Sequence, residues 1–105
     1  MPGIDLNYFI RQANKLTEKI EQRKQELAEE TVEVKTGDGR VTVVANCVQE
    51  IRSIKIDPAL IDPSDPSMLE DLLTAAVNAA LASSREHMQR ELGKISGGVK
   101  IPGIT

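Results

Sequence analysis

The sequence has few of the residues on which many binding and catalytic sites depend. Its 105 residues include no tryptophan and only one each of tyrosine, phenylalanine, cysteine and histidine. A single cysteine excludes an intrachain disulfide and a cysteine metal cluster. Because aromatic residues make up only 2% of the chain, we expect a core of leucine, isoleucine, valine and alanine. No apolar run is long enough to cross a bilayer, which favours a cytoplasmic protein with no membrane partner.

The charge balance also gives little direct help. There are 16 acidic and 13 basic residues, for a formal net charge of −3. Domains that bind nucleic acid usually carry a surplus of basic residues. Composition alone therefore does not indicate DNA binding, and any contact with phosphate would have to come from a local cluster of cations.

Residues 5–29 have the periodicity of one long helix. Asp5 is suited to be its N-cap, because a carboxylate accepts hydrogen bonds from the free N–H groups of the first turn. The apolar residues recur at alternating steps of three and four, which is the spacing of a coiled-coil seam, and Arg23 interrupts the series. The seam residues are Leu6, Phe9, Ala13, Leu16, Ile20 and Leu27. This seam could pack on the protein's own sheet or on a second copy, and the spacing leaves both open.

Three short segments then alternate apolar and polar residues, which predicts an antiparallel meander with one face covered by helices. Gly37 and Gly39 mark the first turn, and Cys47 falls in the second, where we expect it to have no site role. A second helix should begin near Pro66 and stop at Gly93. The prediction is a single α+β domain over 1–105 with the order α-β-β-β-α, in which 93–105 form a flexible tail of glycine and proline. The strand residues expected to face inward are Val32, Val34, Val41, Val43, Ile54 and Ile56.

Element lengths favour a two-fold dimer. Strands of six residues span roughly 20 Å, whereas helices of 25 residues span roughly 37 Å, so the helices must extend beyond the sheet as protruding arms. Apolar residues continue into the extensions, and large exposed apolar surfaces usually mark an interface. The alternative is that the two helices cover each other within one chain. The residues predicted for the dimer interface are Leu6, Phe9, Leu16, Met88 and Leu92.

The chain contains five short motifs of recognisable type. They are "IDP-x-L" ending at Leu60, "LEDLL" ending at Leu73, "G-x-G-x-V-x-V" starting at Gly37, "AA-x-N-x-A" starting at Ala75, and a glycine tail that ends in Pro-Gly at Gly103. Together these motifs resemble the YbaB/EbfC family of bacterial nucleoid-associated proteins. The turn after Asn46 departs from the family pattern, because most relatives have a glycine there. The resemblance implies a small homodimer in the nucleoid with no enzymatic activity, which binds double-stranded DNA with little sequence preference.

Two sets of basic residues are candidates for contact with DNA phosphates. The first recurs every four residues along the first helix, and the second lies near the end of the second helix. Glutamates are interspersed, so an ordinary solvated face of mixed charge is the competing interpretation, and only the resemblance favours DNA. The candidates are Arg11, Lys15, Lys19 and Arg23 in the first set, and Arg85, Arg90 and Lys94 in the second.

Catalysis and metal binding find little support. Ser83, Ser84, His87 and Glu91 share a helical spacing, but nothing predicts an oxyanion hole or a closed pocket around them. The aspartates near the prolines at 58, 63 and 66 match no calcium loop and are better explained as helix caps. We therefore expect no catalytic residue, no metal, no cofactor and no small-molecule substrate. The alternative to a DNA-binding protein is an interaction and dimerisation module that docks a replication or recombination protein.

Overall fold

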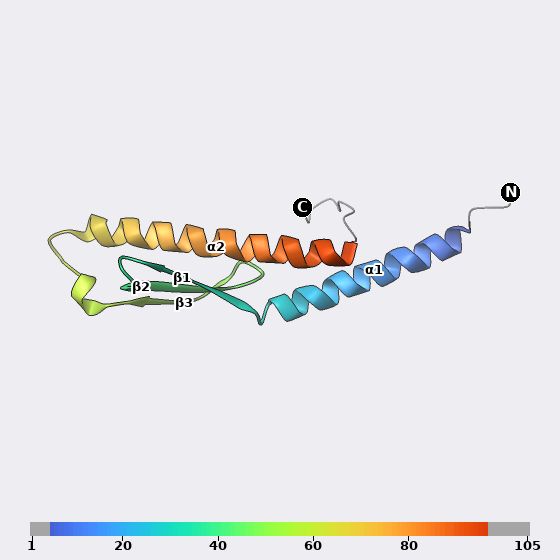
Figure 1. Cartoon of the computed structure of the whole chain (residues 1–105), viewed down its shortest axis with the longest axis horizontal. Coiled ribbons are helices and arrows are strands. Elements are labelled where there is room, and N and C mark those ends of the chain that lie inside the picture. Colours follow the sequence, from blue (N-terminus) through green and yellow to red (C-terminus); the bar gives the residue numbers. More distant parts are fainter. Residues whose placement is uncertain (1–4, 97–105) are drawn as a thin grey trace.

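The computed structural model describes residues 5–96 and confirms the predicted α-β-β-β-α order (Figure 1). A long helix leads into a three-stranded antiparallel sheet of order β1-β2-β3, and a second long helix follows. A single turn of 3-10 helix, η1, joins the sheet to that second helix. The elements are α1 (Leu6–Leu27), β1 (Thr31–Thr36), β2 (Val41–Asn46), β3 (Ile51–Ile56), η1 (Pro58–Leu60) and α2 (Pro66–Ser96).

Two of the three predicted helix ends follow from local chemistry. The Asp5 carboxylate accepts hydrogen bonds from the backbone N–H groups of Asn7 and Tyr8 at 3.0 and 3.3 Å, so it caps α1 as expected. Helix α2 begins at Pro66, whose missing N–H costs nothing at a first helical position. The predicted stop at Gly93 is wrong, because α2 continues through Gly93 to Ser96.

Packing explains the longer helix. Leu92 is buried against α1 and Ile95 packs beside it, so the turn that contains Gly93 is held by tertiary contacts that outweigh the low helix propensity of glycine. The rest of the predicted tail, residues 97–105, lies outside the described residues.

The two turns between strands differ in the residues that adopt the left-handed backbone conformation. In the first, Gly37, Asp38 and Gly39 all have positive φ, at 61°, 57° and 84°. The second has no glycine after Asn46, and Gln49 takes the left-handed conformation with φ of 68°. There the buried Asn46 carboxamide oxygen accepts from the N–H groups of Val48 and Glu50 at 3.1 and 2.9 Å, which holds the turn in place of a glycine.

Helix α2 covers one face of the sheet, over β1 and β2 (Figure 1). Its small residues Ala76 and Ala80 are fully buried and allow a close approach to the buried Val41 and Val43 of β2. This confirms the prediction of a sheet with one covered face. Strand β3 lies further from the helix, and Ile54 on this strand remains 45% exposed.

A second, smaller core joins α1 to the far end of α2. It contains Ile20, Leu27, Leu92 and Cys47, and each has no more than 7% of its surface exposed. Cys47 lies in the second turn, as expected, and this turn folds against the end of α1 and buries the thiol. That Cys47 has no site role stays a prediction. Burial also raises the pKa of Cys47, because a thiolate would lose its hydration.

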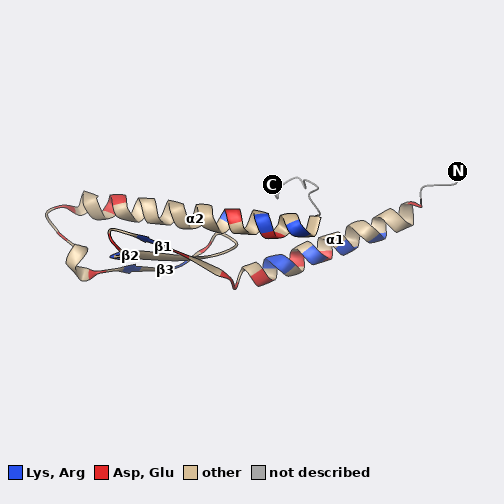
Figure 2. Cartoon of the chain, in the orientation of Figure 1, with Lys and Arg blue, Asp and Glu red and all other residues tan. Residues whose placement is uncertain are grey.

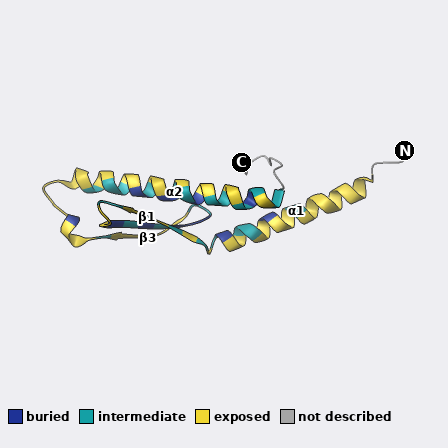
Figure 3. Ribbon diagram, in the orientation of Figure 1, coloured by how far each residue is buried: buried dark blue, intermediate teal, exposed yellow. Residues whose placement is uncertain are grey.

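The first half of α1 extends beyond both cores as an arm (Figure 3). The chain measures 76 × 19 × 17 Å along its principal axes. The two helices cover each other's extensions only in part. Of the predicted interface residues, Leu92 is 1% exposed and Met88 packs beside it, whereas Leu16 is half-buried, and Leu6 and Phe9 are 69% and 56% exposed.

Candidate nucleic-acid interface

Three of the predicted basic residues are exposed on α1 with their charges free. Arg11, Lys15 and Lys19 are exposed, and none forms an ion pair with any residue between 5 and 96. Successive residues of an α-helix turn by about 100°, so these three side chains fall within about 80° of one another around α1. We call Arg11, Lys15 and Lys19 the basic stripe. Figure 2 shows the lysine and arginine positions of α1 in blue.

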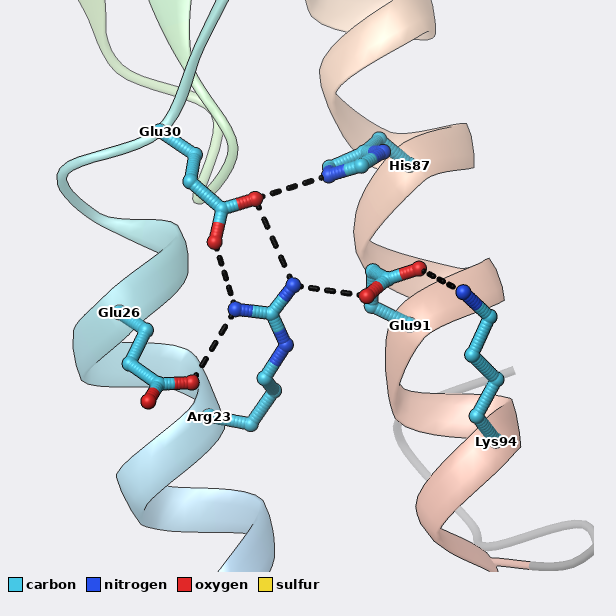
Figure 4. Close-up of polar contacts among 6 residues, drawn as sticks. All are labelled: Arg23, Glu26, Glu30, His87, Glu91 and Lys94. Carbon is cyan, nitrogen blue, oxygen red and sulfur yellow. Dashed lines mark hydrogen bonds and ion pairs between the residues drawn. The ribbon is translucent and has the colours of Figure 1, made fainter.

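Arg23 has a different environment. Its guanidinium donates to Glu30 at 2.5 Å, to Glu91 of α2 at 2.7 Å and to Glu26 at 3.1 Å (Figure 4). Its side chain is only 21% exposed. Three carboxylates already balance its charge, so Arg23 is the least available of the predicted phosphate ligands and instead ties α1 to α2.

The carboxylates of Glu30 and Glu91, which contact Arg23, are held in their ionised form. Lys94 and Arg23 lower the pKa of Glu91 to about 2, because both cations favour the carboxylate. Arg23 and His87 lower the pKa of Glu30, whose Oε1 lies 3.1 Å from His87 Nε2. In turn, Glu30 and Glu91 raise the pKa of Arg23 further above its ordinary value. We call Arg23, Glu30, His87 and Glu91, with Glu26 and Lys94 beside them, the junction cluster.

Sequence reasoning missed the junction cluster, although one signal pointed to it. Arg23 occupies a seam position, where its neighbours Ile20 and Leu27 are buried. A charged residue at such a position needs a partner, since an unpaired charge at an interface between helices is costly. The sequence does not show which carboxylate pairs with the Arg23 guanidinium, because Glu91 lies 68 residues further along the chain.

The junction cluster predicts an acid-sensitive contact between α1 and α2. A carboxylate whose pKa is lowered by folding stabilises the folded state above its ordinary pKa near 4.5, and this contribution is lost as the pH falls toward the folded value. For Glu91 that window runs from 4.5 down to about 2. Thermal melts between pH 6 and pH 2.5 should show a fall in Tm that is smaller in Glu91→Gln. Glu86→Gln, which alters a carboxylate that is 77% exposed, is the matched control and should leave the pH profile as in the parent.

The spacing that suggested a serine, histidine and glutamate set has structural roles in the fold. Ser84 is buried, and its Oγ accepts from the backbone N–H of Gln49 at 3.0 Å, so it supports the second turn. His87 pairs with Glu30 and Glu91 pairs with Arg23. Within 5–96 no hydrogen bond joins a serine hydroxyl to His87, so the pair of nucleophile and base that acyl transfer needs is not formed.

The second basic set lies on the last turns of α2. Arg85, Arg90 and Lys94 are all exposed. Arg90 approaches Glu86 at 3.8 Å, and Lys94 pairs with Glu91 at 2.5 Å. Arg85 has no ion pair with a described residue. Beside this set, a shallow groove of about 250 Å³ between the two helices is lined by Lys19, Gln22, Arg23, Glu26 and Ile95.

Acidic residues near the prolines serve the local backbone. Asp57 accepts from the N–H of Ala59 at 2.9 Å and Asp62 accepts from Ser64 at 2.9 and 2.7 Å, which lowers the pKa of Asp62. Between residues 5 and 96 there is no group of three or more residues suited to hold a metal ion. Over the same range, neither α1 nor α2 is apolar enough to serve as a membrane-spanning helix.

A sequence model of the YbaB/EbfC DNA-binding family matches residues 1–99. The chain belongs to this family. It is 85% identical to a nucleoid-associated protein of Myxococcus xanthus, over the full length of both chains. It is also 46% identical to a nucleoid-associated protein of Anaeromyxobacter dehalogenans, over 97% of this chain and 99% of that one. The family resemblance predicted from the short motifs is therefore confirmed.

A solved structure supports the fold of this family member. The crystal structure of the uncharacterized protein HP0035 from Helicobacter pylori superimposes with a TM-score of 0.81 and covers 90% of this chain and 100% of that chain. The two sequences are only 19% identical, so the likeness concerns the fold alone.

Proposed function

We propose that this member of the YbaB/EbfC family is a non-enzymatic, nucleoid-associated homodimer that binds duplex DNA. The basic stripe on α1 carries the proposal. Its three cations stand on an exposed helix face, free of ion pairs with the described residues, although the chain as a whole has a net charge of −3. Phosphates of a duplex laid along this face would meet lysine and arginine side chains without first displacing a carboxylate.

Binding of this kind carries little sequence information. Lysine and arginine contacts to phosphate fix the position of a protein on DNA but do not read the bases. The family membership supports DNA as the ligand, and the proposed phosphate ligands are those with free charges, namely Arg11, Lys15, Lys19 and Arg85, with Arg90 and Lys94 as further contacts. We therefore expect similar affinities for duplexes of unrelated sequence.

Exposed apolar surface supports the dimer. Leu6 and Phe9 are exposed to solvent on the arm, and Ile51 and Ile54 are exposed on the edge strand β3. A second shallow groove, of about 320 Å³, lies on α2 and is lined by Leu73, Thr74, Val77 and Asn78. A two-fold dimer is the commonest way to cover such surfaces, and an edge strand is a ready site for pairing. Sedimentation equilibrium should give twice the 11.5 kDa mass of one chain, and a single species at 11.5 kDa would refute the dimer.

Salt dependence tests the DNA contact directly. If the three cations of the stripe act in both protomers, six phosphates are neutralised, and log affinity should fall linearly with log salt with a slope of about −5. A mobility-shift titration of a random-sequence duplex at several salt concentrations measures this slope. Affinity that does not change with salt would contradict the phosphate contacts.

The alternative is an interaction module that docks a replication or recombination protein. The exposed apolar residues of the arm and the acidic net charge favour it. If the dimer binds no duplex at low salt, this alternative replaces the DNA-binding proposal.

A further inference from the structure

Tyr8 is the sole tyrosine of the chain, and it lies one helical turn before Arg11, the first residue of the basic stripe. It lies in the first turns of α1 and is 51% exposed. The steps from Tyr8 to Arg11, Lys15 and Lys19 are three, four and four residues, so the ring and the three cations share one face of the helix. Along the helix axis, Tyr8 lies about 16 Å from Lys19.

The other apolar residues of the arm face elsewhere. Leu6 and Phe9 continue the seam that packs against α2 further along α1, and Ile10 is turned by about 200° from Tyr8. Phe9 contacts Tyr8 only edge to face, with 5.9 Å between the ring centroids. The packing of the seam therefore does not account for an aromatic residue at position 8. Tyr8 lies on the same helix face as the basic stripe instead.

We propose that Tyr8 is itself a DNA contact, whose ring packs against the sugars and bases of the duplex that the basic stripe binds. This inference rests on the proposed function. Duplex DNA offers the chemistry that this face matches, because its phosphates meet the three cations while its grooves expose sugars and the edges of the bases. Proteins that hold single-stranded nucleic acid without reading its sequence combine a line of cations with aromatic rings, and the proposal extends this combination to the sugars and base edges in the groove of a duplex.

The composition of the chain supplies a native probe. With no tryptophan and one tyrosine, the ultraviolet fluorescence of the protein comes from Tyr8. Titration with a random-sequence duplex should quench this emission, at the same midpoint as the mobility shift. Heparin, a polyanion without bases, should bind the same stripe and leave the emission nearly unchanged. Quenching by both polyanions to the same extent would overturn the inference, since it would report charge near the ring and no contact with bases.

Variants separate the ring from its surroundings. Tyr8→Ser should weaken duplex binding by about fivefold to tenfold, and Tyr8→Phe, which keeps the ring, should bind as the parent does. Ile10→Ser is the matched control, because Ile10 is 57% exposed and lies two residues away on the other side of α1. It should change affinity by less than about twofold.

The salt slope distinguishes Tyr8 from a phosphate ligand. Loss of the ring releases no counterion, so Tyr8→Ser should lower affinity at every salt concentration and leave the slope of the parent unchanged. Duplex binding by the parent with no change in Tyr8 emission, or equal affinities for Tyr8→Ser and Ile10→Ser, would overturn the inference and leave the proposed function standing. Absence of duplex binding by the parent at low salt would overturn the proposed function, and the inference with it.

Discussion

The double variant Lys15→Glu with Lys19→Glu is expected to weaken duplex binding by about 100-fold or more at 0.1 M salt, because it replaces four phosphate ligands of the proposed dimer with four repelling carboxylates. Both residues are exposed on α1 and lie off the buried seam, so the fold should be unaffected. A mobility-shift titration measures the affinity, and sedimentation equilibrium should show the same oligomer as the parent.

A matched control separates local from overall charge. Lys35→Glu with Lys55→Glu makes the same change in net charge on exposed residues of β1 and β3, away from the arm. This control should bind within about threefold of the parent, since exposed charges further apart than about 10 Å are largely screened at 0.1 M salt. Equal losses in both double variants would show that net charge decides the affinity, and would refute the stripe as the binding surface.

The variant Leu27→Ala is expected to lower the free energy of unfolding by about 2 to 5 kcal/mol, which is the usual cost of a buried leucine truncation. Leu27 is fully buried in the second core, where it packs with Ile20, Cys47 and Leu92. This small core is the apolar part of the contact between α1 and α2, so the cavity should weaken the attachment of the arm as well as the overall stability. Chemical denaturation followed by circular dichroism measures the free energy.

The control for this variant lies on the same helix. Ile10→Ala removes apolar atoms from a side chain that is 57% exposed, and it should change the free energy of unfolding by no more than about 0.5 kcal/mol. If Leu27→Ala has as small an effect as Ile10→Ala, α1 is not held by the second core and the junction cluster alone would have to attach it.

The sequence by itself determined the order of the helices and strands and most of their boundaries. Asp5, Pro66 and the turn at Gly37 act through backbone chemistry within a few residues, so their consequences do not depend on the rest of the fold. The alternation of apolar residues in the strands likewise fixed which face of the sheet is covered. The basic stripe was visible for the same reason, because Arg11, Lys15 and Lys19 depend only on helical spacing.

Only the tertiary structure decided which of these residues are exposed, which are buried and which are held in ion pairs. The placement of α2 over β1 and β2 left Ile54 exposed, and the packing of its last turns on α1 carried the helix past Gly93. The same packing buried Cys47 and brought Glu91 to Arg23 across 68 residues of chain, so that Arg23, a predicted phosphate ligand, forms an ion pair between the helices. Such pairings depend on how distant segments meet, and the free energy that selects them comes from burying apolar surface shared between those segments. No local pattern in the sequence records which segments share that surface.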